Sequence, residues 1–176
     1  NVPNSDPQNF SRDLLQVRLV ANAKYTFSFF VTHLKSQHGG DQADVKRKAE
    51  VQKIREFMRD YEKQNKRSNY ILAGDFNDIP SADSLQPILD PRASGLALHD
   101  IVWEDLGSGP DVFSYHPKEY RSRIDYILPS FGMHADYIKK SVQIHKAPQN
   151  GGNANMFFEA SDHLPITAKF NVEKDL

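Results

Sequence analysis

The sequence predicts an α+β domain in which strands dominate and one long helix packs on them as a layer. Two observations carry this prediction. Apolar runs of strand length recur along the chain and are separated by turn-forming residues. One long segment, residues 42–65, has helical periodicity instead. At 176 residues the chain has the size of a single domain and is large enough to bury a core.

The first two strands are predicted close to the N-terminus. Residues 14–21, LLQVRLVA, form one strand, and a short turn at residues 22–24 leads into residues 25–34, YTFSFFVTHL. Side chains alternate along a strand, so one face of the second strand is shared by Phe27, Phe29, Val31 and His33. We therefore expect a hairpin that ends in His33.

The long helix follows a glycine-containing loop, QHGGD, in which Asp41 is placed to cap the helix. Apolar residues at steps of three and four give the helix one stripe, made of Val51, Ile54, Met58 and Tyr61. We expect this stripe to cover one face of the sheet. The basic run at residues 46–48, KRK, is expected to lie on the solvated face of the helix, with phosphate contact as the alternative.

The central strand is predicted at residues 70–73, where a short apolar run stops at a glycine. A tight turn follows and lifts polar side chains, those of Asp75, Asn77 and Asp78, to one rim of the sheet. Residues 79–90 then indicate a turn and a short helix capped by Ser81 or Asp83. Residues 95–114 are rich in loop-forming residues, with an apolar patch around Trp103.

The remaining strands lie in the C-terminal third of the chain. Residues 122–128 form a strand with Arg123 and Asp125 on one face, which should border a polar site because burying unpaired charges is costly. Residues 134–145 alternate weakly and suggest another strand, and a flexible loop at residues 146–155 follows. The closing segment has a buried face formed by Ile166, Ala168, Phe170 and Val172.

Composition excludes several kinds of function. The formal net charge is −1, so no global positive field attracts polyanions. The absence of cysteine excludes disulfides, thiolate metal sites and thiol nucleophiles. No apolar stretch approaches the ~20 residues that cross a bilayer. The first residue is not Met, so we expect the chain to begin after processing or partway through a longer protein.

Polar residues stand at four predicted strand ends. The set consists of His33, Asp75, Asn77, Asp125, Asp162 and His163. Hydrolysis of a phosphate ester needs groups that orient and deprotonate water, bind a cation and assist the leaving oxygen, and carboxylates, amides and histidines supply them. Each motif alone is more typical of a turn, an ion pair or a surface histidine. Their joint occurrence favours a hydrolytic site.

The ordered series THLKS, GDFN, SRIDYIL and SDH resembles the endonuclease/exonuclease/phosphatase superfamily, whose fold is that of deoxyribonuclease I, apurinic endonucleases, neutral sphingomyelinases and inositol-polyphosphate 5-phosphatases. The resemblance runs from about residue 11 to residue 170 and looks closest to bacterial members of unassigned substrate. It implies the C-terminal portion of a four-layer α/β/β/α sandwich with mostly antiparallel sheets. The expected activity is hydrolysis of a phosphodiester, with Mg²⁺ or Mn²⁺, or alternatively Ca²⁺, as the cofactor.

The resemblance also assigns roles to individual residues. Asp75 would orient or deprotonate the attacking water and bind metal, and Asn77 would position water and phosphate. His163 would contact the scissile phosphate as acid/base, with Asp125 hydrogen-bonded to it. Two further assignments complete the set: a metal-binding carboxylate at Asp162, and stabilisation of the phosphate or leaving group by His33. Arg123 is expected to hold its own strand and the neighbouring loop.

The chain departs from the family in its N-terminal part. Family members place an asparagine and a metal-binding glutamate on early strands, whereas the first glutamate here is Glu50, inside the predicted helix. We therefore expect residues 11–172 to be the C-terminal portion of the domain, between an irregular linker at 1–10 and a tail at 173–176. The missing part, about 100 residues by domain size, is expected as a separate chain or as a portion removed from this one. The alternative is a phosphate-binding or scaffold module of the same fold that does not catalyse hydrolysis.

The sequence does not decide whether the substrate is a nucleic acid or a small phosphorylated molecule. Basic and aromatic residues near the motifs are candidate substrate contacts: Lys35, Tyr115, Lys118, Tyr120 and Arg121. Five scattered groups in a chain of near-zero net charge do not establish a nucleic-acid groove. The same tyrosines equally fit a small head group or a closed loop.

Overall fold

The computed structural model describes residues 10–65, 69–116, 120–146 and 161–173. Its elements in chain order are β1 (Leu15–Asn22), β2 (Tyr25–His33), α1 (Asp41–Gln64), β3 (Tyr70–Asp75), α2 (Gln86–Leu89), α3 (Pro91–Ser94), α4 (Ile101–Leu106), β4 (Asp125–Pro129), α5 (Phe131–Ala135), β5 (Gln143–Ile144) and β6 (Ile166–Thr167). The predicted α+β class is confirmed. In the described part of the chain, no helix is both long and apolar enough to cross a membrane.

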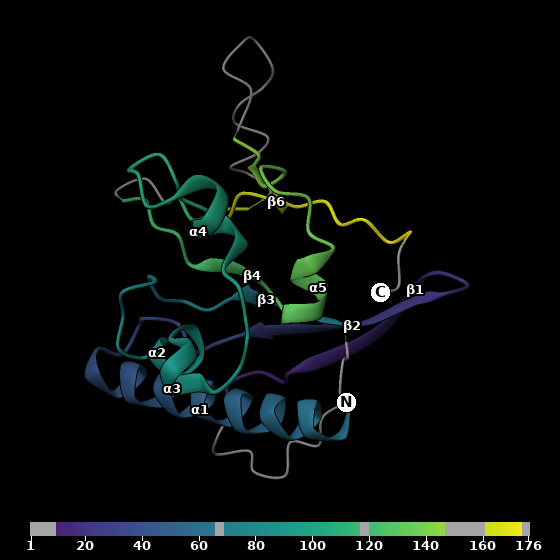
Figure 1. Ribbon diagram of the computed structural model, residues 1–176. Helices are drawn as coiled ribbons and strands as arrows, with labels where there is room; N and C mark the ends of the chain where they lie inside the picture. The colour runs from purple at the N-terminus through teal and green to yellow at the C-terminus, as the bar shows by residue number, and fades with distance from the viewer. Residues whose placement is uncertain (1–9, 66–68, 117–119, 147–160, 174–176) are drawn as a thin grey trace.

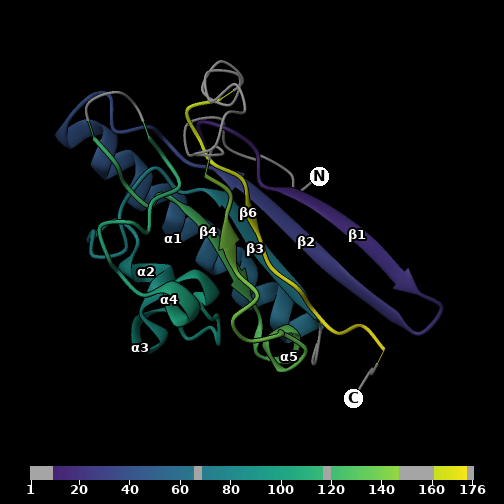
Figure 2. The same ribbon diagram turned by 90° about the horizontal axis from the view of Figure 1, so that it is seen from above.

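The four longer strands form one sheet in the order β1-β2-β3-β4, and β5 and β6 form a separate pair. The β1/β2 and β3/β4 pairs are antiparallel, whereas β2 and β3 are parallel because α1 connects them. Figure 1 shows α1 below the sheet, with α4, α5 and β6 above it. Seen from above in Figure 2, β1 lies at one side of the sheet and β4 at the other.

The face of the sheet that α1 covers contains the largest core cluster. The apolar stripe of α1 was predicted correctly, since Val51, Ile54 and Met58 are fully buried there. They pack with Phe30 of β2 and Leu72 of β3. Burial of each such side chain contributes about 1.5–3 kcal/mol. This packing fixes α1 across the sheet.

The predicted solvated basic run of α1 is wrong at one position. Arg47 is almost fully buried, and its guanidinium donates to the Asp78 carboxylate at 2.9 and 2.6 Å and to the Lys35 carbonyl at 3.1 Å. It also pairs with Asp44. A buried charge is tolerated only when it is paired in this way. Asp78, expected at the functional rim, therefore ties α1 to the turn after β3.

Two predicted helix caps are also wrong. The residue before α1 is Gly40, and no side chain caps this end, so Asp41 is simply the first helical residue. The short helix α2 begins only at Gln86, after Leu85, so neither Ser81 nor Asp83 caps it.

Cap chemistry that the pattern did not reveal created two further helices. The segment predicted as loop contains α4, because the Asp100 carboxylate accepts a hydrogen bond from Trp103 N at 3.1 Å. The weakly alternating segment predicted as a strand begins with the end of α5, which Ser130 caps through Met133 N at 3.3 Å. Only the two residues of β5 are strand there.

The closing segment is a strand only at β6, yet its predicted alternation is confirmed further along. On the side of the sheet away from α1, one core cluster packs against Ile166, Ala168 and Phe170. A neighbouring cluster packs against Phe170 and Val172. The expected linker at 1–10, the flexible loop at 146–155 and the tail at 173–176 lie almost wholly outside the described residues.

One face of β1 is apolar and open. Leu15, Val17 and Leu19 are 46%, 38% and 39% exposed, and the register places them opposite residues 27–31 of β2, on the side away from α1. Large apolar patches on a soluble protein mark contact surfaces. Among the described residues, no element covers this face of β1.

Candidate active site

The sheet itself aligns three of the predicted site residues. His33, the last residue of β2, is in register with Asp75, the last residue of β3. Asp75 is in turn opposite Asp125, the first residue of β4. The three side chains therefore occupy one row across three hydrogen-bonded strands, at the same edge of the sheet. His33 Nε2 lies 3.3 Å from Asp75 Oδ2.

The turn after β3 fixes the Asp75 carboxylate. Asn77 has a φ of +54°, a left-handed conformation that asparagine tolerates better than most residues. In this conformation its backbone N–H donates to Asp75 Oδ1 at 2.8 Å. Its side-chain Nδ2 donates to Asp75 Oδ2 at 3.1 Å and to the Leu34 carbonyl at 3.0 Å. Both carboxylate oxygens of Asp75 are thus held in place.

Gly74 permits the close approach of β2 and β3 beside the site. It has a φ of +137°, and a Cβ at this position would lie 2.0 Å from the carbonyl oxygen of Thr32. We expect Gly74→Ala to lower the free energy of unfolding by about 2–5 kcal/mol, through a strained backbone and a steric clash. Denaturant unfolding of the full-length protein measures this change.

The matched control for this prediction is Gly109→Ala. A Cβ at Gly109 meets no atom within 4 Å, so its effect should stay within about 0.5 kcal/mol. Equal free energies of unfolding for the two variants would contradict the packing seen at Gly74.

His163 reaches the same site from a different part of the chain. Its Nδ1 is hydrogen-bonded to Asp125 Oδ2 at 2.8 Å, and its Nε2 lies 3.8 Å from Asp75 Oδ2. The second distance is too long for a direct hydrogen bond, so Nε2 stays available to a bound group. The ring packs against Tyr115, with 4.9 Å between ring centroids.

The surroundings shift two pKa values in directions that suit proton transfer. Burial raises the pKa of the half-buried Asp75 carboxyl, and the charge of Asp125 acts in the same direction. The hydrogen bond from Asp125 raises the pKa of His163, and the charges of Asp125, Asp75 and Asp162 add to this while burial opposes it. A raised pKa makes Asp75 a stronger base, and a raised pKa keeps the His163 imidazole protonated, and so able to donate a proton, to higher pH.

Asp162 is the exposed member of the predicted set. Its carbonyl accepts a hydrogen bond from His116 N at 2.9 Å, which anchors the backbone beside His163. Its carboxylate acts electrostatically on both His163 and Tyr115. Three carboxylates, those of Asp75, Asp125 and Asp162, therefore concentrate negative charge around one imidazole. Carboxylate oxygens are ligands that a hard divalent cation prefers, although these three carboxylates do not gather around one point.

The two predicted basic substrate contacts, Lys35 and Arg121, make local contacts of their own. Lys35 Nζ donates to the carbonyl of His38 at 2.9 Å. The Arg121 guanidinium lies over the ring of Phe113, 4.7 Å from its centroid. The rings of Tyr115 and Tyr120 contact each other, with centroids 5.7 Å apart, and Lys118 lies outside the described residues.

Ser114 is a positioning residue that the sequence did not reveal. It is fully buried, and its hydroxyl accepts the backbone N–H of Asp125 at 3.1 Å. Its carbonyl accepts Leu164 N at 2.6 Å, next to His163. Ser114 therefore joins the two segments that carry the Asp125–His163 pair. A single serine within FSY gives no sequence signal of this role.

Arg123 supports the site from outside, as predicted. Its guanidinium donates to both carboxylate oxygens of Asp100, at 3.0 and 2.7 Å, and lies over the Tyr126 ring at 4.6 Å. It therefore holds the start of α4 to β4. The ion-pair partner of Arg123 is thus Asp100, while Asp125 pairs with His163.

The model of the Endonuclease/Exonuclease/phosphatase family matches residues 11–163. The chain belongs to this family. A search of curated proteins gives no match. The family's name joins enzymes that cleave phosphodiesters with enzymes that cleave phosphomonoesters, so membership alone leaves the substrate open.

Solved structures show the same fold. A mannosyl-6-phosphatase of Bacteroides thetaiotaomicron is 23% identical with a TM-score of 0.55, covering 84% of this chain and 52% of that one. A 3'-5' exonuclease of Neisseria meningitidis is 19% identical with a TM-score of 0.56, covering 82% and 61%. An AP endonuclease of Archaeoglobus fulgidus is 14% identical with a TM-score of 0.58, covering 83% and 62%. The chain thus spans between about half and three fifths of these proteins.

Proposed function

We propose that this chain carries the acid/base groups of a divalent-metal-dependent phosphoesterase, which hydrolyses a phosphodiester of a nucleic acid or of a small phosphorylated molecule. The carrying observation is the convergence of Asp75, Asp125 and His163, far apart in the sequence, at distances of 2.8 and 3.8 Å. The phosphatase and nuclease structures of the same fold are consistent with this chemistry.

The proposed reaction is one in-line displacement without a covalent enzyme intermediate. The Asp75 carboxylate orients a water and accepts its proton as the new P–O bond forms, and Asn77 keeps that carboxylate fixed. Protonated His163 donates a hydrogen bond from Nε2 to a phosphoryl oxygen, while Asp125 holds Nδ1. His33 would stabilise the phosphate or the leaving oxygen as the old P–O bond breaks, and the leaving oxygen takes up a proton from solvent.

The metal ligands proposed from this chain are Asp75 and Asp162. Mg²⁺ binds few carboxylates and keeps several waters, which suits one half-buried and one exposed carboxylate. Mn²⁺ has the same preference for oxygen ligands, and Ca²⁺ is the third cation to be compared. When bound, such a cation supplies charge neutralisation at the phosphate. The remaining ligands would come from the part of the domain outside this sequence.

A partner surface belongs to the same proposal. The open apolar face of β1 is suited to contact the rest of the domain, whether on the same polypeptide or on a separate chain. The share of the solved structures that this chain covers, 52–62% for the three described above, supports that partner.

A substrate panel tests the activity directly. The full-length protein, with Mg²⁺, is assayed on plasmid DNA, RNA, sphingomyelin, inositol phosphates and a generic diester, and each assay is repeated with Mn²⁺, Ca²⁺ and a chelator. We expect at least one substrate to be hydrolysed and the activity to disappear with the chelator. Phosphate binding without turnover on every substrate would favour the alternative, a phosphate-binding module.

A further inference from the structure

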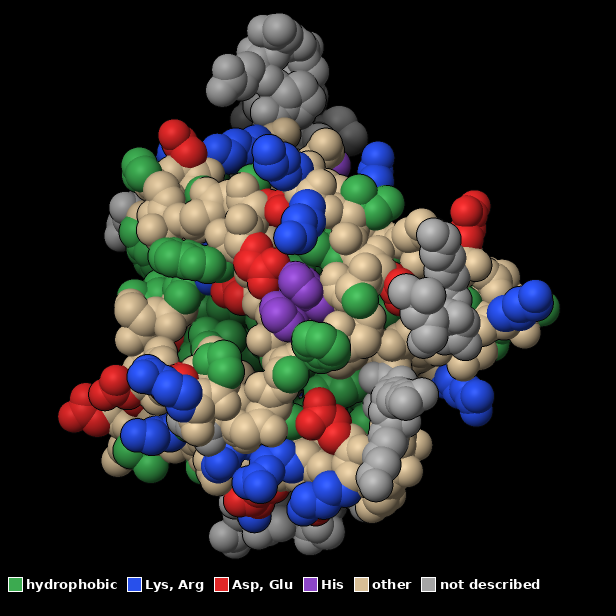
Figure 3. All heavy atoms as spheres, in the orientation of Figure 1, with side chains coloured by type: hydrophobic (Ala, Val, Ile, Leu, Met, Phe, Trp, Pro, Cys, Tyr) green, Lys and Arg blue, Asp and Glu red, His purple; other side chains and the backbone are tan. Residues whose placement is uncertain are grey.

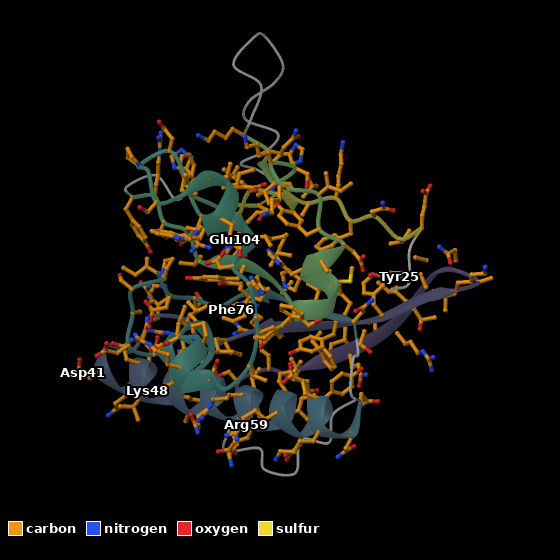
Figure 4. The ribbon with its side chains drawn as sticks, in the orientation of Figure 1. Tyr25, Asp41, Lys48, Arg59, Phe76 and Glu104 are labelled. Atoms are coloured by element: carbon orange, nitrogen blue, oxygen red, sulfur yellow. The ribbon has the colours of Figure 1, made fainter. Side chains whose placement is uncertain are left out.

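Two histidines and a glutamate form a second polar cluster, away from the candidate active site. His99 Nδ1 lies 3.1 Å from Glu104 Oε1, and His134 Nε2 lies 2.7 Å from Glu104 Oε2. In the described part of the chain, this is a group of three ligand atoms that all lie within 4.8 Å of one another. Figure 4 labels Glu104, and Figure 3, in the same orientation, shows histidine beside acidic side chains at the middle of this face.

The two imidazole rings are stacked unusually closely. Their centroids are 3.7 Å apart and their planes differ by 6°, whereas aromatic pairs commonly have centroids 4.5–7 Å apart. Each ring directs one nitrogen to the same carboxylate. One nitrogen of each ring and the two carboxylate oxygens of Glu104 are therefore gathered in one place, with each nitrogen beside a different oxygen.

The backbone holds this arrangement in place. His99 N donates to the Pro129 carbonyl at 3.1 Å, and His134 N donates to the Ser130 carbonyl at 2.7 Å, so both histidines are anchored at the end of β4. Glu104 lies in α4, whose first turn is capped by Asp100. The side chains are supplied by three short, separately anchored segments, which preorganises the cluster.

We propose that His99, Glu104 and His134 form a binding site for a transition-metal cation, with Zn²⁺ as the best match. Two imidazoles and one carboxylate are a zinc ligand set that leaves a fourth position for water. Ligand atoms about 2.05 Å from zinc in a tetrahedron lie roughly 3.4 Å apart, so the nitrogens and oxygens, now 3.1 and 2.7 Å apart, would have to separate slightly and the two rings to turn for an ion to enter. Mg²⁺ and Ca²⁺ prefer oxygen ligands and bind weakly to a site with two imidazole nitrogens.

The zinc site is separate from the proposed hydrolysis. Asp125 begins β4 and Pro129 ends it, so the two sites lie roughly 13 Å apart along the strand. A cation held by the three residues would join the loop before α4, α4 itself and α5, and would stabilise this side of the fold. The two proposals are independent: the acid/base assignments can hold if no zinc binds, and zinc can bind if the chain does not hydrolyse phosphate esters.

The test is a Zn²⁺ titration against a competing chelator, with the full-length protein in excess Mg²⁺ to occupy oxygen-rich sites. Wild type is compared with Glu104→Gln, which keeps the side-chain shape, with the double variant His99→Ala/His134→Ala, and with His145→Ala as control. His145 is an exposed histidine bonded to Thr167 at 2.8 Å, outside the cluster. We expect the double variant to bind one Zn²⁺ fewer than wild type and His145→Ala.

The Glu104→Gln variant should bind the same Zn²⁺ at least tenfold more weakly, since losing an anionic ligand costs no less than losing an outer hydrogen bond. At free Zn²⁺ 100-fold above Kd, the Tm of wild type should rise by roughly 5–10 °C, and that of the double variant should not. Equal Zn²⁺ stoichiometry and affinity in wild type and the double variant would overturn the proposal. It would also be overturned if Glu104→Gln left the affinity unchanged.

Discussion

Asp75→Asn is expected to lower kcat by roughly 10²–10⁴-fold on whichever substrate the panel identifies, because it removes the group proposed to accept a proton from the attacking water. Asparagine has nearly the same shape and still offers an oxygen to the backbone N–H of Asn77, while only the bond from Asn77 Nδ2 is lost, so the turn should keep its conformation. Steady-state kinetics of the full-length variant, with circular dichroism to check the fold, measure the effect.

Asp83→Asn makes the same chemical change at an exposed carboxylate eight residues along the chain and should leave kcat unchanged. A kcat for Asp75→Asn within tenfold of wild type would show that Asp75 is not the base. A large loss in both variants would point to general electrostatics rather than to a base at Asp75.

His163→Ala is the second change with a large expected effect, a loss of kcat of roughly 10²–10⁴-fold. The substitution removes the Nε2–H proposed to bind the phosphoryl oxygen and leaves the Asp125 carboxylate without its hydrogen-bond partner. Because groups that act together do not contribute additively, the double variant with Asp75→Asn should lose little beyond either single variant. Fully additive losses in kcat would contradict a shared site.

The pH profile separates the role of Asp125 from a structural one. Asp125 raises the pKa of His163, so protonated His163 persists to higher pH, and activity should fall as the pH rises through that pKa. In Asp125→Asn the pKa of His163 drops, and this alkaline limb should move to lower pH. A variant with reduced kcat but an unmoved limb would show that Asp125 only stabilises the fold.

The strand framework could be predicted because its cause is local. Apolar periodicity located β1, β2, β3 and the buried stripe of α1, and three of the predicted site residues, His33, Asp75 and Asp125, stand at strand ends. The Asp125–His163 hydrogen bond followed from the family resemblance and is present at 2.8 Å. The row of His33, Asp75 and Asp125 required the strand register, which no single segment specifies.

The errors have a common physical origin in interactions between distant segments. Arg47 sits in a basic run and is buried because Asp78, 31 residues away, pairs with it. The helices α4 and α5 arise from single capping side chains, which a periodicity argument passes over. His99 and His134 stand in no motif that would indicate a shared role. The fold stacks their rings on each other beside the Glu104 carboxylate.

The alignment of His33, Asp75 and Asp125 on neighbouring strands has a consequence for how this protein can diversify. Backbone hydrogen bonding, rather than any surface connection, sets the spacing of these three groups. The long connections that border the rim can therefore lengthen, shorten or change composition while the reacting groups stay where they are. In such a scaffold the loops set substrate specificity and the strands set the catalytic geometry, so specificity can change through the loops alone.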